Sequence, residues 1–353
     1  MKKVANVLAG IVAIVGLLPG SGACFDSGST GADGDFNPSV STEVPLPPNG
    51  VLNYRSVNIP AGVTVRFKRN ATNTPVIMLV AGDVVIAGTM NLAGEAALPT
   101  GPVGGNDDFL DDGLPGKGAP GGFDGGHGGV PAGSESKGGR GLGPGGGGGG
   151  TGNYAGSGGG AGHATAGGRG HVFGSPGEAG STYGSKYLLP LIGGSGGGGG
   201  YTGPSYRGCG GGGGGGAILL AATGKVTISG LVTANGGAGG AGVASGYAWL
   251  GTGGGGSGGA IRIVATQIVG TGEISAAGGP QGTGGAGYGG AGWVRLESDA
   301  IAFSGSVNPP FTFAAPGPLF MASQPAVRFA SVAGIPVPGE PTGSNDLTIP
   351  TTT

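Results

Sequence analysis

One short pattern of alternating apolar and polar residues returns several times along the chain. It reads GGAILLAATGKVTISGLVTANGG from Gly215 and GGAIRIVATQIVGTGEISAAGG from Gly258. A more degenerate copy begins at Gly290, and an earlier one spans Pro75 to Gly94. Alternation with a period of two is typical of half-buried β-strands. The chain therefore contains an internal repeat of strand-forming units.

Each copy has three short apolar runs separated by glycine-containing steps, and such a unit cannot bury its apolar face alone. Stacking the copies would pair each strand with its counterpart in the next copy. We therefore predict an all-β fold, a short right-handed parallel β-helix, because a β-sandwich would need two-residue hairpin turns. In the copy from Gly215, the residues expected to face inward are Ile218, Leu220, Val226, Ile228, Val232 and Ala234.

Residues 101–216 interrupt the repeat with long glycine runs such as PGGGGGG and GGSGGGGG, in a chain with 95 Gly among 353 residues. Two interpretations are open. The insertion is a flexible linker, as glycine-rich linkers are. Alternatively it packs as side-by-side polyglycine helices of the polyproline II type, whose backbones approach closely only where no Cβ intervenes. The fold prediction is thus a β-helix with long glycine-rich insertions that are polyglycine-II-like in the second interpretation.

Composition divides the chain into six segments. Residues 1–23 have a basic start, an apolar run and small residues at the end, which is the pattern of a signal peptide. The remaining segments are a Pro/Asp-rich spacer (24–53), an N-terminal cap and first β-coil (54–100), the glycine-rich insertion (101–216), β-helix coils with glycine-rich loops (217–312), and a Pro/Thr-rich C-terminal cap and tail (313–353).

The two cysteines leave the anchoring of the mature chain open. Gly22, Ala23 and Cys24 are similar to a bacterial lipobox, which predicts lipidation at Cys24, although ordinary cleavage and secretion is the alternative. The predicted location is accordingly an outer-membrane or cell-surface lipoprotein, or the extracellular space. If Cys24 is acylated, Cys209 is a lone thiol, and otherwise the two could form a disulfide.

Few residues offer metal chemistry, and no cofactor is expected. The segment GGNDDFLDDG, with its acidic residues at Asp107–Asp112, is similar to one unit of a calcium-binding β-helix repeat, or else is a solvated acidic loop. His127, His163 and His171 lie in glycine-rich surroundings at spacings that match no metal-ligand motif. With a formal net charge of −2 and no basic patch, the chain is not expected to bind nucleic acid.

The remaining candidate site lies on the outward face of the coils. The middle outward position of the first strand is Met78, Leu219, Arg262 and Arg295 in the four copies, so the two arginines would stack one coil apart. Glu297 follows on the same face, and we weigh a solvated ion pair against contact with an anionic glycan. No carboxylate pair recurs on any face, so no catalysis is predicted.

GGAIL and GGAIR resemble the GGA[ILV] motif of the chlamydial polymorphic outer-membrane proteins, a family of β-helical adhesins, although their FxxN motif is missing. The whole chain resembles the glycine-rich secreted β-helix proteins of Gram-negative bacteria. These resemblances imply no particular activity. The repeated Gly-Gly corners and the absence of a convergent polar site instead favour a non-catalytic structural or adhesive surface protein. Its expected partners are polysaccharide or other surface components and further copies of the chain, with membrane contact only through a lipid anchor. The alternatives are a carbohydrate-binding or carbohydrate-active β-helix and an ice- or mineral-surface binder.

Overall fold

A computed structural model describes residues 25–99, 113–130, 137–152, 156–170, 175–201, 208–242, 251–282, 285–321 and 331–337. All regular elements in these ranges are strands, and they include no helix long and apolar enough to cross a membrane. The expected signal peptide lies outside the described residues. The strands are β1 (Asp35–Phe36), β2 (Thr42–Pro45), β3 (Val51–Tyr54), β4 (Ser56–Ile59), β5 (Thr64–Lys68), β6 (Val76–Val80), β7 (Val84–Ile86), β8 (Thr89–Asn91), β9 (Ala217–Ile228), β10 (Leu231–Thr233), β11 (Ala260–Gly270), β12 (Glu273–Ser275), β13 (Trp293–Phe303), β14 (Ser306–Asn308), β15 (Thr312–Ala314), β16 (Ser331–Val332) and β17 (Ile335–Pro336).

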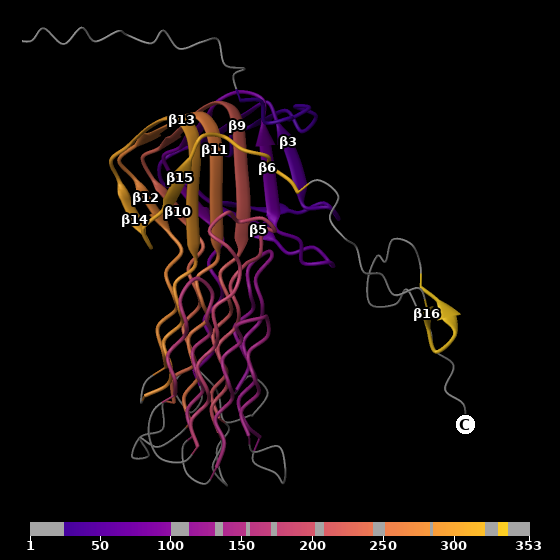
Figure 1. The fold of residues 1–353 in the computed structure, drawn as a ribbon, viewed down its shortest axis with the longest axis vertical. Helices are drawn as coiled ribbons and strands as arrows, with labels where there is room; N and C mark the ends of the chain where they lie inside the picture. The colour runs from indigo at the N-terminus through magenta and orange to yellow at the C-terminus, as the bar shows by residue number, and fades with distance from the viewer. Residues whose placement is uncertain are drawn as a thin grey trace, which may run out of the picture.

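Strands β1 to β15 form two all-parallel sheets, and the chain alternates between them, as in a parallel β-solenoid, while β16 and β17 pair antiparallel with each other (Figure 1). Sheet A has the order β1-β4-β7-β9-β11-β13-β15, with β3 and β6 paired beside this path. Sheet B has the order β14-β12-β10-β8-β5-β2. One coil is a strand of sheet A, a turn, and a short strand of sheet B. The predicted parallel β-helix is confirmed.

Stacked ladders of apolar side chains fill the space between the two sheets. Ile218 of β9 lies in register with Val76 before it and Ile261 after it, and all three are buried. In sheet B, Val232 lies between Met90 and Ile274 in the same way. Because the inward residues of one coil rest on those of the next, each coil buries an apolar face that it could not bury alone. All six residues expected to face inward in the copy from Gly215 belong to this core.

The coil differs from the sequence expectation in two respects. The first two apolar runs of a copy do not meet at a corner, because β9 and β11 continue through the step with a bulge between Ala265 and Gln267. In addition, Ile77 and not Met78 lies in register with Leu219 on the outward face, while Met78 is fully buried in the core. The run VIMLV is apolar throughout, so alternation could not fix its register.

The structure places β1 and β2 within the residues that the sequence assigned to a spacer. Val44 is partly buried against the core, and β2 pairs with β5 as the edge strand of sheet B. Pro45 is tolerated there because an edge strand leaves one side of its backbone unpaired.

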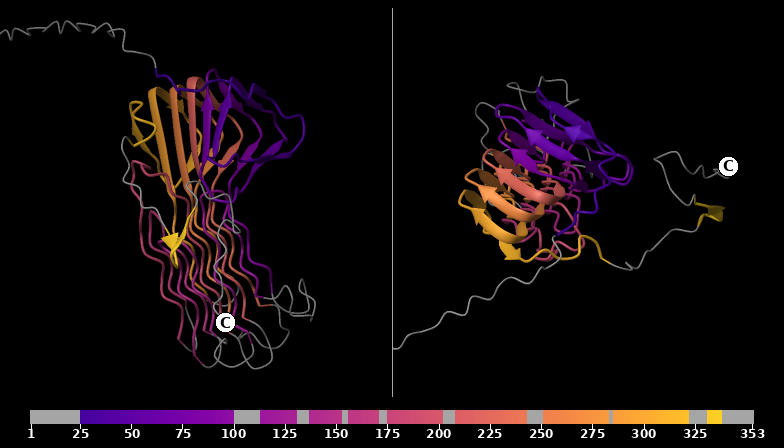
Figure 2. Two further views of the ribbon diagram at one scale, coloured as in Figure 1. Left: turned by 90° about the vertical axis from the view of Figure 1, so that its right-hand side faces the viewer. Right: turned by 90° about the horizontal axis from the view of Figure 1, so that it is seen from above.

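The glycine-rich segments run side by side from one end of the solenoid as a bundle of extended chains, which we call rows (Figure 2). Residues 208–216 form a central row, and their backbone N–H groups donate to three different rows in turn. Every third residue returns to the same neighbour, which is the period of the polyproline II helix. The bonds are Gly211 to Gly126 and Gly214 to Phe123, Gly212 to Gly254 and Gly215 to Ser257, and Gly213 to Glu95 and Gly216 to Leu92.

The carbonyl groups of this central row accept bonds from three further rows, so six rows surround it. Donors come from Gly116 and Ala119, from Gly194 and Gly197, and from Gly237 and Gly240. At Gly211 this arrangement leaves no space for a side chain, because a Cβ there would lie 2.0 Å from the carbonyl oxygen of Gly197. The bundle therefore requires glycine in its centre, and the packed polyglycine interpretation is confirmed for the residues of the insertion that the structure describes.

Rows at the surface of the bundle have one side that faces solvent, and residues other than glycine occupy that side. In the row of residues 124–130, Asp124, His127 and Val130 stand at every third position and are partly or fully exposed, while the glycines between them are buried. With three residues per turn, every third side chain leaves the row in the same direction. This surface row therefore follows an X-Gly-Gly pattern, whereas the central row of residues 208–216 is almost pure glycine.

Candidate functional site

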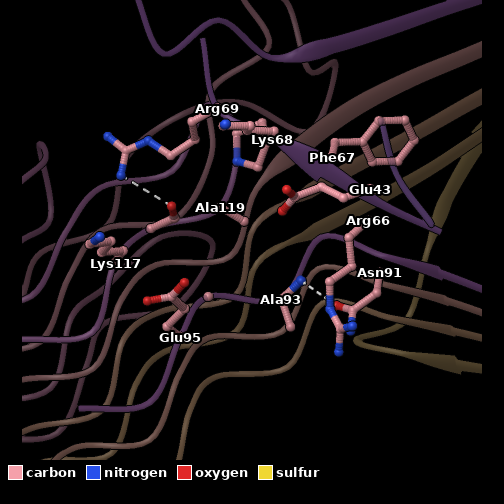
Figure 3. Close-up of a pocket in the computed structure, with 13 residues that line it drawn as sticks. Glu43, Arg66, Phe67, Lys68, Arg69, Asn91, Ala93, Glu95, Lys117 and Ala119 are labelled. Atoms are coloured by element: carbon pink, nitrogen blue, oxygen red, sulfur yellow. Dashed lines mark hydrogen bonds between the residues drawn. The ribbon is translucent and has the colours of Figure 1, made fainter. Parts of the chain in front are cut away.

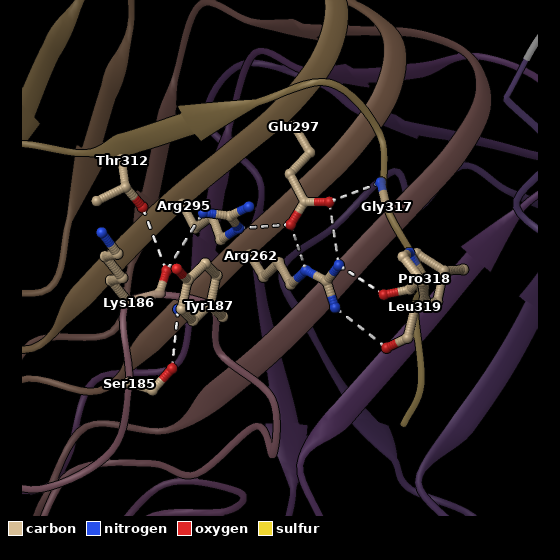
Figure 4. Close-up of polar contacts among 10 residues, drawn as sticks. All are labelled: Ser185, Lys186, Tyr187, Arg262, Arg295, Glu297, Thr312, Gly317, Pro318 and Leu319. Atoms are coloured by element: carbon tan, nitrogen blue, oxygen red, sulfur yellow. Dashed lines mark hydrogen bonds and ion pairs between the residues drawn. The ribbon is translucent and has the colours of Figure 1, made fainter. Parts of the chain in front are cut away.

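Arg262, Arg295 and Glu297 meet on the outward face of sheet A (Figure 4). Arg262 of β11 lies in register with Arg295 of β13, as the repeat predicts. The Nε and Nη2 atoms of Arg262 donate to the two carboxylate oxygens of Glu297 at 2.8 and 3.0 Å. The Nε atom of Arg295 donates to the same carboxylate at 2.6 Å. One carboxylate thus bridges two guanidinium groups that would otherwise repel each other.

The C-terminal segment after β15 closes over this cluster. Arg262 also donates from Nη1 to the carbonyl of Leu319 at 3.1 Å and from Nη2 to that of Pro318 at 2.8 Å. The backbone N–H of Gly317 donates to Glu297 at 3.0 Å. The side chains of Arg262 and Glu297 are only 2% and 1% exposed. The ion pair was expected to be solvated, and this prediction was wrong. Residues 317–319 fold back over the sheet and bury the pair.

The electrostatics of the cluster favour a permanent ion pair. Burial acts to raise the pKa of Glu297, but its hydrogen bonds with Arg262 and Arg295 outweigh burial and lower that pKa below its usual 4.5. The carboxylate consequently stays ionised at neutral pH. These contacts fix the C-terminal segment to β11 and β13, and an anionic ligand at Arg262 would have to displace Glu297. Ligand binding by these three residues stays a prediction.

A second polar site is a groove between the outward face of sheet B and the neighbouring rows of the bundle (Figure 3). Its volume is about 470 Å³. Strands β2, β5 and β8 contribute one wall, and residues 93–95 and 117–120 contribute the other. The charged or amide side chains that line it are Glu43, Arg66, Lys68, Arg69, Asn91, Glu95 and Lys117. We call this site the junction groove.

The junction groove is held open by one fixed ion pair. Arg69 contacts the carboxylate of Asp124 and donates to the carbonyl of Gly118 at 3.1 Å. The N–H of Gly118 in turn donates to Asp124 at 2.8 Å. These contacts join the end of β5 to two rows of the bundle, so the two walls are fixed relative to each other. The sequence analysis missed this groove. The alternation of Arg66 and Lys68 in the predicted first coil was a signal for it, but Glu43 lay in the segment assigned to a spacer.

A third cluster is buried where the bundle meets the solenoid. The His163 ring stacks on Tyr183 with 4.5 Å between ring centroids, and its Nδ1 lies 2.8 Å from the carbonyl oxygen of Gly258. The hydroxyl of Ser195 donates to that of Tyr183 at 3.0 Å, and the N–H of Ser195 donates to the hydroxyl of Ser257 at 2.8 Å. Burial lowers the pKa of His163 to about 4 and raises that of Tyr183 to about 12. Both groups are therefore neutral and internally bonded, as in a structural cluster.

The other sequence-predicted positions are not brought together. His127 is exposed on a surface row and His163 is buried, while His171 lies outside the described residues. Asp107–Asp112 and Cys24 also lie outside them, so neither calcium binding, lipidation nor a disulfide is tested. Cys209 is buried in the central row. In the described part of the chain, no three His, Cys, Asp or Glu side chains come close enough to hold a metal ion.

Fold and site together define a parallel β-solenoid that carries a polyglycine bundle and a charged groove at their junction. Comparisons with protein-family models, with curated proteins and with solved structures found no match. The function must therefore be argued from the geometry itself.

Proposed function

We propose that this chain is a non-catalytic structural and adhesive protein of the bacterial cell surface or extracellular space, in which the solenoid carries the polyglycine bundle as a rigid projection. The observation behind this proposal is the hydrogen bonding of residues 208–216, whose N–H groups donate to three surrounding rows in turn. A glycine-rich linker would leave these groups to water. A backbone bonded to six neighbours has the rigidity that a structural element needs.

The chemistry of the described side chains also supports a non-catalytic role. The most buried carboxylate, Glu297, is paired with two arginines and covered by the C-terminal segment. The neutral His163 is buried and the neutral Tyr183 is half-buried, and both are bonded to backbone or hydroxyl groups. A general acid or base must reach a substrate proton. Glu297 and His163 lack the exposure for that task, and the Tyr183 hydroxyl is already bonded to Gly193 and Ser195.

Carbohydrate binding is a second candidate function, and the junction groove is the specific observation that favours it. The groove is open to solvent, combines cations, carboxylates and an amide, and has fixed walls. Such a set of hydrogen-bonding groups suits a hydroxyl-rich ligand. Binding of this kind is compatible with an adhesive role.

Hydrogen exchange measured by mass spectrometry on the full chain tests the structural proposal. We expect slow exchange in peptides from residues 193–201 and 208–216, comparable to that of β9, because nearly every N–H in these rows is bonded within the protein. Residues 60–62, which form an exposed turn, serve as the internal control for fast exchange. Fast exchange in the rows together with slow exchange in β9 would contradict a rigid bundle.

A further inference from the structure

The junction groove holds three unpaired cations, which outnumber the two carboxylates that line it. Arg66, Lys68 and Lys117 are exposed, and none of them forms an ion pair within the described residues. They come from distant parts of the chain, two from β5 and one from a surface row of the bundle. A protein with a formal net charge of −2 thus gathers a local excess of positive charge at one groove. Such an excess attracts anionic ligands.

The same groove also offers hydrogen-bonding groups of the opposite kind. Glu43 lies in register with Arg66, and Arg66 with Asn91, so carboxylate, guanidinium and amide follow one another across sheet B. Glu95 lines the opposite wall. The Oδ1 atom of Asn91 accepts the N–H of Ala93 at 2.9 Å, which orients its amide. Carboxylate and amide oxygens accept hydrogen bonds from hydroxyl groups.

We infer that the junction groove binds an acidic polysaccharide, with Arg66, Lys68 and Lys117 on its carboxylate or sulfate groups and Glu43, Glu95 and Asn91 on its hydroxyls. This inference rests on the proposed adhesive function and names its ligand class. A nucleic acid fits less well, because two carboxylates would face its phosphates. Bases would also lack a stacking platform, since Phe67, the aromatic residue of the lining, is buried.

The two walls are fixed before any ligand arrives. Strand β5 is paired on both sides, with β2 and β8, and the row of residues 116–119 is bonded to the central row through Gly116 and Ala119. The Arg69–Asp124 pair joins these walls. A ligand therefore orders only side chains on binding, which lowers the entropic cost.

The test is isothermal titration calorimetry of the full chain with a hexamer of galacturonate and with a heparin hexasaccharide. We expect at least one of them to bind, with a dissociation constant that rises at least 10-fold in the double variant Arg66→Ala/Lys68→Ala. The matched control Lys137→Ala/Arg140→Ala removes two exposed cations from a surface row outside the groove and should change affinity less than 2-fold. Raising the salt concentration should weaken binding, because exposed charges are screened.

Three results would overturn the inference. The first is that neither acidic hexasaccharide binds, and the second is an equal loss of affinity in the groove variant and the control variant. The third is equally tight binding of a six-residue polyglutamate, which would show that the groove recognises negative charge and not carbohydrate. Cellohexaose, a neutral hexamer, should bind at least 10-fold more weakly than the acidic ones. Hydrogen exchange on the same samples separates the two proposals. Protected rows without glycan binding would leave the structural role standing, whereas unprotected rows would remove that role.

Discussion

The solenoid and the polyglycine bundle are both arrays of extended chains joined by backbone hydrogen bonds, yet they are stabilised in different ways. In the solenoid, each inner strand bonds to neighbours on its two edges within a sheet, which leaves two faces for side chains. One face carries the ladders of Val, Ile, Leu and Met that fill the core. In the bundle, a central row bonds to six neighbouring rows, so no face of it is free of backbone neighbours. Its stability comes from the backbone itself.

This difference explains how one chain uses two opposite compositions. A sheet gains stability from large apolar side chains, because burial removes apolar area from water. A polyglycine bundle gains it from close backbone contact, which any Cβ prevents: on Gly128 a Cβ would lie 1.8 Å from the carbonyl oxygen of Gly208. The number of bonded neighbours thus decides whether a side chain stabilises or disrupts the array.

The largest expected effect comes from a test that makes the same substitution, Glu to Gln, once in the solenoid and once in the bundle. Glu297→Gln in the solenoid leaves the buried Arg262 without a counter-charge, so we expect the free energy of unfolding to fall by about 3–5 kcal/mol. The control Glu178→Gln breaks the exposed pair with Arg169 on the bundle, where both side chains are more than half exposed, and should lose less than about 1 kcal/mol. Urea unfolding monitored by circular dichroism measures both. Similar losses in the two variants would mean that the buried Glu297 cluster does not fix the C-terminal segment to the sheet.

A smaller effect tests the need for glycine in the centre of the bundle. The Cβ introduced by Gly211→Ala would lie 2.0 Å from the carbonyl oxygen of Gly197, so rows must separate, and we expect a loss of about 3 kcal/mol together with faster exchange in residues 193–201. The control Gly62→Ala, in an exposed turn, has no atom within 4 Å of the new Cβ. The Gly62→Ala substitution is opposed only by the positive φ of 82° at this position, which costs about 1 kcal/mol.

The outcome for Gly211→Ala must be read against that control. A loss no larger than that of Gly62→Ala would show that the rows are loosely packed, and the distinction between the two regions would then fail. Faster exchange confined to the turn at Gly62 in the control would confirm that the assay reports local changes.

The coils could be predicted from the sequence because their signal is local and repeated. Alternation placed Ile218 and Leu220 on the inward face, and repetition at Gly258 and Gly290 required a stack. Where alternation is lost, as in VIMLV, the prediction was wrong by one residue at Met78. Register in such a run depends on the neighbouring strand and not on the run itself.

For the bundle, the sequence narrowed the structure to two alternatives but could not decide between them, because a glycine run has the same local sequence in a flexible linker and in a packed row. The deciding signal lies in the surface rows, where Asp124, His127 and Val130 recur at every third position. The burial of Arg262 and Glu297 had no such signal, since the covering residues 317–319 are Gly, Pro and Leu without a pattern. The junction groove brings β5 together with Lys117 of the insertion, and such a juxtaposition depends on the path of the whole chain.

The smallest of these effects concerns His163, which lies where the two regions meet. Burial holds its pKa at about 4, while in the unfolded chain it is near 6.5, so the unfolded state binds the extra proton first as the pH falls. The free energy of unfolding should therefore decrease by about 2 kcal/mol from pH 7 to pH 5, before the window of Glu297 below pH 4.5 is reached. His163→Phe keeps a ring beside Tyr183 but cannot titrate, and urea unfolding at pH 5, 6 and 7 should show most of this decrease removed. An unchanged decrease in the variant would mean that His163 takes up its proton in the folded state, and the junction would then be open to water.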